Sequence, residues 1–314
     1  MKKFSSLLLS AAFFAAPSIA SADPTVAPGI IVYGLRSPMA LGRVASSVTV
    51  ITREDIERKN KSTVPELLRD VSGLSVANNG GAGQTTPIFM RGTNSNQVLV
   101  VLDGVVVNDP SDPGTAFDFS NLTTDNIERI EVLRGPQSSL YGSQAIGGVI
   151  NIITRKGKGA PRYNAYAETG RYRTVKAGAG TSGEMGRTSY SFQFARGHTA
   201  GISSFDKKFG GVEKDGNDTY TLSANLAAKL AEQFTAKFTT RSNRSNTQFD
   251  SIGSFVRPYD DPDPVNDSRQ LNVRAAGELS LMEGRWTQEL GISRLHLNRS
   301  QITEYYDTLF NTYF

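Results

Sequence analysis

Cysteine is absent from this chain of 314 residues, and histidine and tryptophan are scarce, with two copies and one copy. Without cysteine there is no disulfide framework and no thiolate metal site. The two histidines, His198 and His296, lie too far apart for a His-rich metal motif. The net charge of +4 is a mild excess of positive charge and does not indicate nucleic-acid binding. These absences exclude a disulfide-stapled domain and a thiolate or His-rich metal centre.

Beyond the N-terminus, the chain also lacks an apolar run of transmembrane-helix length. The apolar stretch Leu7–Ala16 follows Lys2 and Lys3 and is too short for a span. Ala20-Ser21-Ala22 then completes an A-x-A cleavage site, so residues 1–22 are predicted to be a secretory signal peptide. If such an exported protein sits in a membrane, it must do so as a β-barrel.

Catalytic motifs are lacking as well. Gly80–Thr85 is rich in glycine, but it has no Lys-Ser/Thr pair to contact phosphate and metal. Gly178–Gly183 fits the pattern GxGxxG, yet it falls between two predicted strands with no helix after it, so we interpret it as a turn. No Ser-His-Asp order, carboxylate pair or metal-ligand spacing stands out. We therefore do not expect an enzyme.

Residues 46–157 predict a compact α+β domain. Its most informative part is Ile127–Thr154, where a short strand, a proline-started helix, a double glycine and an apolar β-branched strand follow one another. Taken alone, this stretch also fits a structural corner of an ordinary globular domain. Strands are expected at 47–52, 74–77, 88–91, 98–107, 130–133 and 149–154, and helical segments from Thr52, over 63–73, over 125–129 and over 137–141. Polar loops are expected at 78–86 and 109–123.

From Arg162 onward, the chain shows long alternation of apolar and polar residues, for example Tyr190, Phe192 and Phe194 between serines and a glutamine. Segments of about ten residues with one apolar face are typical of a transmembrane β-barrel. A soluble β-sandwich also alternates, but its strands are usually about five or six residues long. Short turns alternate with long loops, as barrel asymmetry predicts. Seven strands are expected, at 162–169, 172–180, 187–196, 218–230, 233–241, 269–281 and 286–296.

The stretch RGPQSSLYGSQAIGGVINIITRKG, which begins at Arg134, resembles the end of the plug domain of TonB-dependent outer-membrane receptors. Other segments match that family in its own order. Ile30-Ile31-Val32-Tyr33-Gly34 resembles a TonB box, 47–52 the first plug strand, 66–74 the plug helix, Ile88–Gly92 the "IRG" motif and Val100–Val105 the "IDG" motif. Ser72 departs from the pattern, since the family often has proline there.

The resemblance implies a domain order and a set of partners. It implies a signal peptide at 1–22, a TonB box and linker at 23–45, a plug at 46–157 and the N-terminal part of a transmembrane β-barrel at 158–314. Residues 30–34 would pair with TonB by β-strand addition, since proline and glycine on both sides keep them out of a sheet of their own domain. The expected location is the Gram-negative outer membrane, in contact with its lipid and energised through the inner-membrane complex. For residues 30–34, the alternative to a TonB box is an ordinary disordered linker.

The resemblance is narrower for vitamin B12 (cobalamin) receptors, through residues 79–84 and 91–96. It implies cobalamin as the first ligand and a ferric siderophore or haem as the alternative. Amide side chains offer both donors and an acceptor to such a ligand, although the same residues simply favour loops. The candidate ligand contacts are Asn78, Asn79, Gln84, Asn94, Ser95 and Asn96.

Two further site predictions come from the family. Arg91 and Arg134 would anchor the plug to carboxylates on the barrel wall, because a guanidinium suits bidentate pairing. Acid-rich loops would hold Ca²⁺, as in cobalamin receptors, although acidic residues at such irregular spacing more often belong to a merely solvated loop. The candidate calcium ligands are Asp206, Glu213, Asp215, Asp218 and Asp250. No other cofactor is expected.

Seven strands are too few to close around a plug, since plugged transporters use about 22. We therefore expect an incomplete barrel, as in an N-terminal fragment or a truncated gene product. Two functions stay open at this point. One is TonB-dependent uptake of a large, scarce nutrient, and the other is a plug-only periplasmic product without transport activity.

Overall fold

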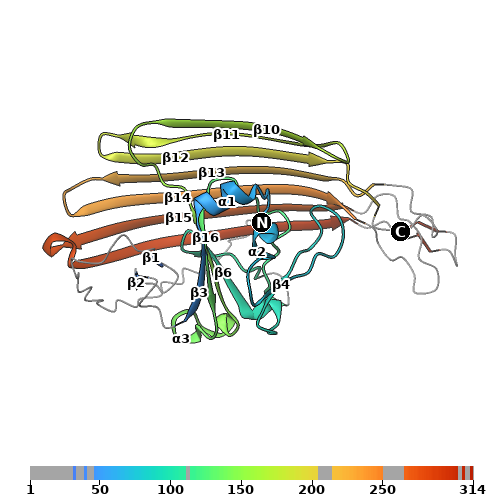
Figure 1. Cartoon of the computed structure of the whole chain (residues 1–314), viewed down its shortest axis with the longest axis horizontal. Helices are drawn as coiled ribbons and strands as arrows, with labels where there is room; N and C mark the ends of the chain where they lie inside the picture. Colours follow the sequence, from blue (N-terminus) through green and yellow to red (C-terminus); the bar gives the residue numbers. More distant parts are fainter. Residues whose placement is uncertain are drawn as a thin grey trace, which may run out of the picture.

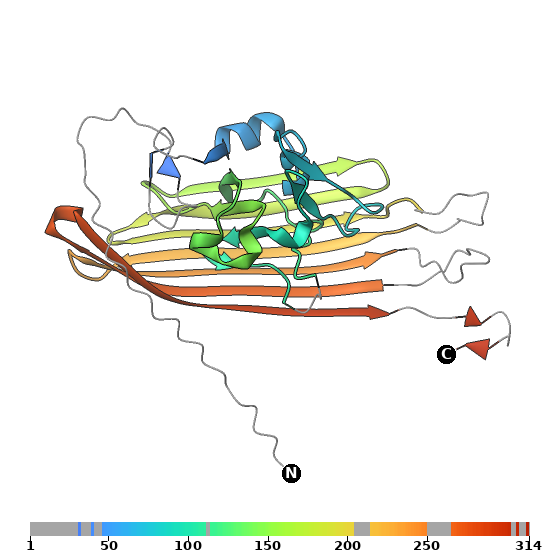
Figure 2. The same cartoon turned by 90° about the horizontal axis from the view of Figure 1, so that it is seen from below.

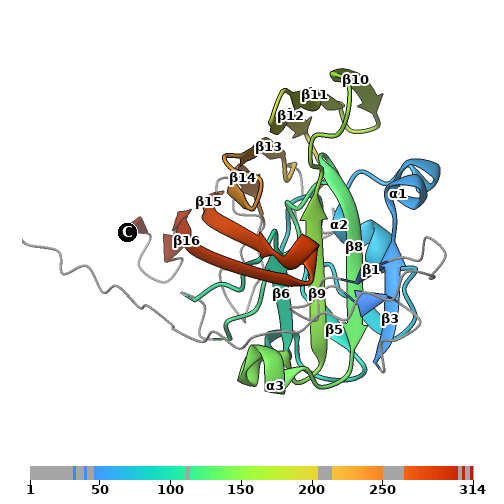
Figure 3. The ribbon, with the colours of Figure 1, turned by 90° about the vertical axis from the view of Figure 1, so that its left-hand side faces the viewer.

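The computed structural model describes residues 31–32, 39–40, 46–110, 114–203, 214–249, 265–302, 306–307 and 312–313. They form an N-terminal α+β domain and a curved, seven-stranded antiparallel sheet that partly wraps around it (Figures 1 and 3). The predicted signal peptide lies outside the described residues. No helix among the described residues is long and apolar enough to cross a membrane.

The N-terminal domain is built on a five-stranded sheet with the order β3-β8-β9-β6-β7. All neighbours are antiparallel except β6 and β9, which run parallel. A separate hairpin pairs β4 with β5. The strands are β3 (Ser47–Ile51), β4 (Leu74–Val76), β5 (Ile88–Met90), β6 (Val98–Leu102), β7 (Val105–Val106), β8 (Ile127–Arg134) and β9 (Gly148–Thr154).

Short helices join these strands. They are α1 (Arg53–Lys59), α2 (Val64–Leu68), α3 (Ser138–Tyr141) and the 3-10 turns η2 (Ser95–Gln97) and η3 (Ser143–Ala145). Thr52 begins α1 with a capping box, in which its hydroxyl accepts from the N–H of Asp55 and the Asp55 carboxylate accepts from the N–H of Thr52. Pro65 stands in the first turn of α2, where its missing N–H costs nothing.

Apolar side chains cover both faces of the central strands. On one face, Ile130, Val132 and Ile150 pack with Leu67 of α2 in the larger core cluster. On the opposite face, a second cluster is formed by Leu99, Val101, Leu133, Ala145 and Val149. The side chains of β6 are therefore buried on both faces of the sheet.

Three sequence predictions for this domain were wrong in detail. Residues 98–107 form a hairpin instead of one strand, because Asp103 and Gly104 both take positive φ and turn the chain. Residues 125–129 are not a helical turn, since β8 already begins at Ile127 and pairs with Thr154. The helix from Thr63 ends at Leu68 instead of Gly73, where a φ of 80° belongs to the left-handed region.

The large sheet has sequential strand order and agrees in number and position with the seven predicted strands. Its strands are β10 (Arg162–Gly170), β11 (Thr174–Met185), β12 (Thr188–Thr199), β13 (Asn217–Lys229), β14 (Phe234–Gln248), β15 (Val265–Leu281) and β16 (Trp286–Ile302). The turn η5 (Met282–Gly284) joins the last two. Among the described residues, β10 and β16 each have one neighbour in this sheet, so the barrel is not closed.

Most of the observed strands are longer than predicted, mainly at one end. The interpretation of Gly178–Gly183 as a turn was wrong, because β11 continues through it to Met185 and pairs with β12 there. Residues 242–248 and 265–268 continue β14 and β15, although they are polar on both faces and therefore show no alternation. This end also carries the connections β12–β13 and β14–β15 and the small pair β17 (Tyr306–Asp307) and β18 (Thr312–Tyr313) (Figure 2). We call it the loop end, and the opposite end, with the turn before β12 and the turns before β14 and β16, the turn end.

Candidate functional site between the domain and the curved sheet

Side chains of the large sheet separate into two chemical faces. On the concave face, Ser191, Thr221 and Ser223 are buried against the N-terminal domain. On the convex face, the alternating neighbours Phe192 and Leu222 are exposed. An exposed apolar outer face and a polar inner face are what a membrane-embedded barrel wall requires.

Hydrogen bonds tie the N-terminal domain to the concave face at its centre. Asn225 of β13 donates through Nδ2 to the Thr154 hydroxyl at 2.7 Å and to the Arg155 carbonyl at 2.9 Å. Asn126 donates to the Ser223 hydroxyl at 3.0 Å and accepts from the Ser191 hydroxyl at 3.2 Å. These contacts join the end of β9 and the start of β8 to β12 and β13.

Asp103, in the β6–β7 turn, joins the same network. Its carboxylate accepts from the backbone N–H and the hydroxyl of Thr154, at 2.8 and 2.7 Å. Burial raises the pKa of Asp103, and the two hydrogen bonds from Thr154 oppose that effect. Next to it, Gly104 lies so close to Arg274 of β15 that a Cβ would come 3.3 Å from the guanidinium. The turn is therefore pressed against the large sheet.

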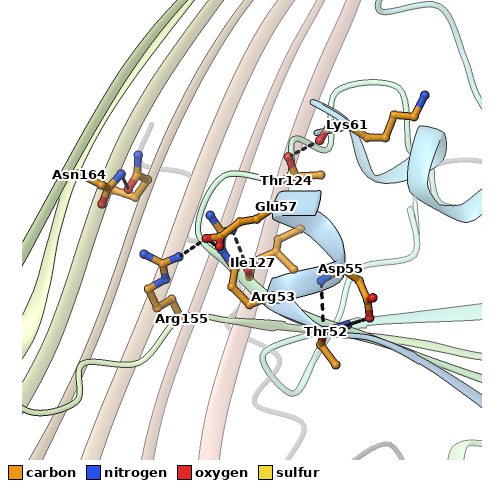
Figure 4. Close-up of polar contacts among 10 residues, drawn as sticks. Thr52, Arg53, Asp55, Glu57, Lys61, Thr124, Ile127, Arg155 and Asn164 are labelled. Carbon is orange, nitrogen blue, oxygen red and sulfur yellow. Dashed lines mark hydrogen bonds and ion pairs between the residues drawn. The ribbon is translucent and has the colours of Figure 1, made fainter. Parts of the chain in front are cut away.

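Helix α1 carries a charged cluster toward the same interface (Figure 4). Arg53 donates to the Glu57 carboxylate at 2.7 Å and to the Ile127 carbonyl at 3.1 Å. Arg155 lies 3.7 Å from the same carboxylate. Burial lowers the pKa of Arg155, and the nearby Arg53 lowers it further. The cluster links α1 to β8 and to the segment that leaves the domain for β10.

A cleft of about 840 Å³ separates α1 and α2 from β10–β13. It extends from Gly81–Gly83 at the loop end to Thr123–Asn126, and its walls carry both polar and apolar surface. A cleft of this volume is large enough for a sizeable ligand.

The predicted ligand loop 78–86 lies at the loop end. Gln84 donates through Nε2 to the Gln248 carbonyl at 2.9 Å. A Cβ on Gly83 would come 2.6 Å from the Asn217 side chain, so glycine is required where the loop meets β13. Asn78 and Asn79 stay exposed. The loop is therefore fixed to the large sheet and keeps two exposed amides, of which Asn78 accepts a hydrogen bond from the Gly80 N–H at 2.9 Å.

The other predicted ligand residues lie elsewhere. Asn94, Ser95 and Asn96 follow the opposite end of the β4–β5 hairpin, at η2. This turn packs on η3, and the Gly147 N–H donates to the Gln97 carbonyl at 2.9 Å. The structure thus does not bring the six predicted contacts together, and their role in ligand binding stays a prediction.

Arg91 and Arg134 do lie side by side. Arg134 is buried and donates to the Ser72 carbonyl at 2.7 Å and to the Ser47 hydroxyl at 3.1 Å. A Cβ on Gly73 would lie 3.4 Å from Arg134 and 3.7 Å from Arg91. Burial lowers the pKa of Arg134, and the charge of Arg91 adds to this. Within the described residues neither forms an ion pair with a carboxylate.

The predicted TonB box and calcium site fall partly outside the described residues. Ile31–Val32 forms β1, which pairs with β2 (Met39–Ala40) and not with the domain's own sheet, whereas Ile30, Tyr33 and Gly34 are not described. Asp206, Glu213 and Asp250 are not described either. Asp218 pairs with His198 at 3.0 Å, and the described residues contain no group of three or more potential ligands around Asp215 or elsewhere. Both sites stay predictions.

Sequence reasoning missed the inner polar residues of β13 and β14 that hold the domain. Asn217 and Asn243 donate to the side chain and the carbonyl of Asn121, at 3.2 and 2.8 Å. Arg299 of β16 lies 3.6 Å from Asp109. Their positions on the concave side of each alternating strand were the available signal.

Comparisons with known proteins agree with this geometry. Residues 40–149 match the family profile of the TonB-dependent receptor plug domain. Among solved structures, the fold is similar to the ferripyoverdine receptor of Pseudomonas aeruginosa bound to ferripyoverdine, with a TM-score of 0.72, 16% identity, and coverage of 88% of this chain and 37% of that chain. The ferric yersiniabactin uptake receptor of Yersinia pestis gives a TM-score of 0.61, 20% identity, and coverage of 81% and 41%.

A ferric enterobactin receptor mutant of Pseudomonas aeruginosa is similar too, with a TM-score of 0.64, 19% identity, and coverage of 87% of this chain and 45% of that chain. The chain therefore spans less than half of the receptors that it matches. At these identities the likeness shows the fold: a TonB-dependent receptor plug domain followed by a seven-stranded, unclosed part of the receptor wall.

Proposed function

We propose that this plug domain and wall belong to an outer-membrane receptor for TonB-dependent active uptake. The observation that carries the proposal is the position of a plug domain on the polar, concave face of a wall whose convex face is apolar. A passive pore does not fit, because the domain lies inside the curve of the sheet. Nor does catalysis, since the site gathers amides, hydroxyls and paired charges and the matched proteins are receptors.

A ferric siderophore is the ligand class that we favour. The similar solved structures are siderophore receptors by their descriptions. Positive charge at the loop end of this chain is complementary to an anionic ferric complex: Arg171 and Arg173 are exposed in the β10–β11 turn, and Lys176 lines the cleft. Cobalamin is the second candidate, and the exposed amides of Asn78 and Asn79 favour it.

In this proposal TonB binds the segment around β1. Two-residue strands such as β1 and β2 form a weak pair, so their separation costs little. Residues 30–34 would then be free to add as a strand to TonB. Force applied there reaches β3 directly, and from β3 it reaches β8 and the network around Thr154.

The experiment that tests uptake compares two proline variants in cells that depend on this receptor. Ile31→Pro removes a backbone donor inside the predicted TonB box, whereas Ala40→Pro only breaks the internal β1–β2 pair. We expect Ile31→Pro to bind radiolabelled ligand at the cell surface while its accumulation falls to the level of a TonB-deficient strain. Ala40→Pro should transport normally. Undiminished accumulation in Ile31→Pro would overturn the energised mechanism.

A loop replacement tests the ligand site. Ala77 donates to the Pro87 carbonyl at 3.2 Å, and a Gly-Ser-Gly-Ser linker in place of residues 78–86 can retain that bond, which needs no N–H from Pro87. We expect this variant to lose binding of the ferric siderophore or of cobalamin, whichever the parent binds. Ser75→Ala, at an exposed position of β4 in the same hairpin, is the control and should bind normally. Unchanged affinity in the loop variant would refute the site assignment.

A further inference from the structure

A row of arginines crosses the convex face of the wall. Arg196 of β12 faces Tyr220 of β13, which faces Arg244 of β14, which in turn faces Arg269 of β15. All four side chains are exposed, and their concave neighbours Ala195, Thr221 and Ser245 are buried. We call Arg196, Arg244 and Arg269 the arginine row. The exposed side chains lie on the convex face, away from the plug, although Arg196 also borders the cleft.

The row lies at the border of the apolar band. One step toward the turn end, the convex residues are Phe194, Leu222, Ser242 and Leu271, and the three apolar side chains are exposed by 48%, 54% and 39%. One step toward the loop end, they are His198, Asp218, Asn246 and Asp267. The guanidinium groups therefore lie where the apolar surface ends, the level at which a bilayer changes from acyl chains to headgroups.

The charges of the row are not balanced within the wall. Arg244 and Arg269 are directly opposite each other, and like charges in that position repel. They share the single carboxylate of Asp267, at 3.6 and 3.1 Å. Arg196 stacks 5.1 Å above the Tyr220 ring, and Asp218 is engaged by His198. The side chains of Arg244 and Arg269 are still more than half exposed. The row can therefore accept a further anion from outside.

We propose that the arginine row binds the phosphorylated headgroup of a lipid in the external leaflet of the outer membrane. A guanidinium suits phosphate through paired N–H donors. The same lipid would lay its acyl chains on Phe194, Leu222 and the apolar band below. Charge and apolar surface thus complement the two ends of one amphipathic molecule. The proposal rests on the wall lying in a bilayer, and it requires neither TonB nor a transported ligand.

The test is native mass spectrometry of the receptor extracted from outer membranes, titrated with diphosphorylated lipid A or its dephosphorylated form. We expect the phosphorylated lipid to bind and the dephosphorylated lipid to bind weakly. The triple variant Arg196→Gln, Arg244→Gln, Arg269→Gln should bind the phosphorylated lipid on the order of 100-fold more weakly, given the usual contribution of each cation near an anionic surface. Asp267→Asn, which releases two of the arginines, should bind more tightly.

The matched control removes three exposed cations from the turn end of the same sheet: Arg187→Gln, Lys229→Gln, Arg285→Gln. An equal loss in the control, equal binding of both lipids, or unchanged binding in the arginine-row triple would overturn the proposal. The proposal would also be overturned if millimolar inorganic phosphate competed for the arginine row as strongly as the phosphorylated lipid does. Ligand uptake should be normal in the triple variant. Failure of the wall to insert into any bilayer would instead refute the proposed function.

Discussion

At the scale of single residues, the contact between plug and wall depends on a few buried polar groups. Asn225, Thr154 and Asp103 form one chain of hydrogen bonds from β13 to the β6–β7 turn. A buried group that loses its partner keeps the full cost of its desolvation. Removal of one member therefore has a larger effect than its single bond indicates.

Asn225→Ala should weaken the attachment of the plug. The variant leaves the Arg155 carbonyl without its donor and the Thr154 hydroxyl without one of its partners, at a cost of about 1–3 kcal/mol. Hydrogen exchange at residues 154–156, measured in the detergent-solubilised receptor, should become faster. Asn164→Ala is the control, since Asn164 bonds only within the sheet, to Gln193 at 3.2 Å. If both variants exchange alike, the network does not hold the plug.

Asp103 should make the fold less stable as pH rises. Because burial raises its pKa, the folded protein binds more protons than the unfolded chain between the ordinary value of 3.8 and the raised pKa. Stability therefore falls across that window and then stays level. Asp103→Asn mimics the protonated acid and should remove this slope from urea unfolding curves.

Asp70→Asn is the comparison of opposite sign. Lys59 lowers the pKa of Asp70, so its contribution is present above 3.8 and is lost as pH falls through the lowered value. Subtraction of each variant's curve from that of the parent isolates the two residues. A parent-minus-Asp103→Asn difference that rises with pH would contradict the burial of this carboxylate.

At the scale of elements, short helices and hairpins depend on their ends. Helix α1 has only seven residues, too few to be stable without its cap and its packing on β8. Thr52→Ala should destabilise the plug by about 1 kcal/mol, because the Asp55 N–H loses its acceptor. Thr52→Ser retains the hydroxyl and should restore most of that loss in chemical denaturation. Equal destabilisation by serine would mean that the methyl group, and not the cap, matters.

The same scale explains which elements the sequence predicted well. The seven wall strands were found because one face is apolar wherever a strand crosses the band. Their polar extensions, such as 242–248, were missed because both faces there are polar. The β6–β7 hairpin was missed because apolar residues continue on both sides of the two-residue Asp103-Gly104 turn, so the sequence looks like one long strand.

At the scale of the whole molecule, the wall presents two open edges among the described residues, at β10 and β16. A bilayer offers no hydrogen-bond partner to an open edge, so each unpaired backbone group there would cost several kcal/mol. In the proposed outer-membrane setting both edges need partners, so we expect hydrogen exchange along β10 and β16 to be as slow as at β13. Fast exchange at either edge would show that the wall stays open.

The sequence by itself determined the position of most strands, the plug motifs and the separation of polar from apolar faces, because these follow from local residue patterns. The family motifs predicted Arg91 and Arg134 as anchors of the plug to wall carboxylates, and the fold places the two side by side. Only the tertiary structure separated Asn78 and Asn79 from Asn94–Asn96, and only it placed Arg196, Arg244 and Arg269 in one row. Strand register decides both, and register is set by pairing between distant segments, which alternation along one strand does not contain.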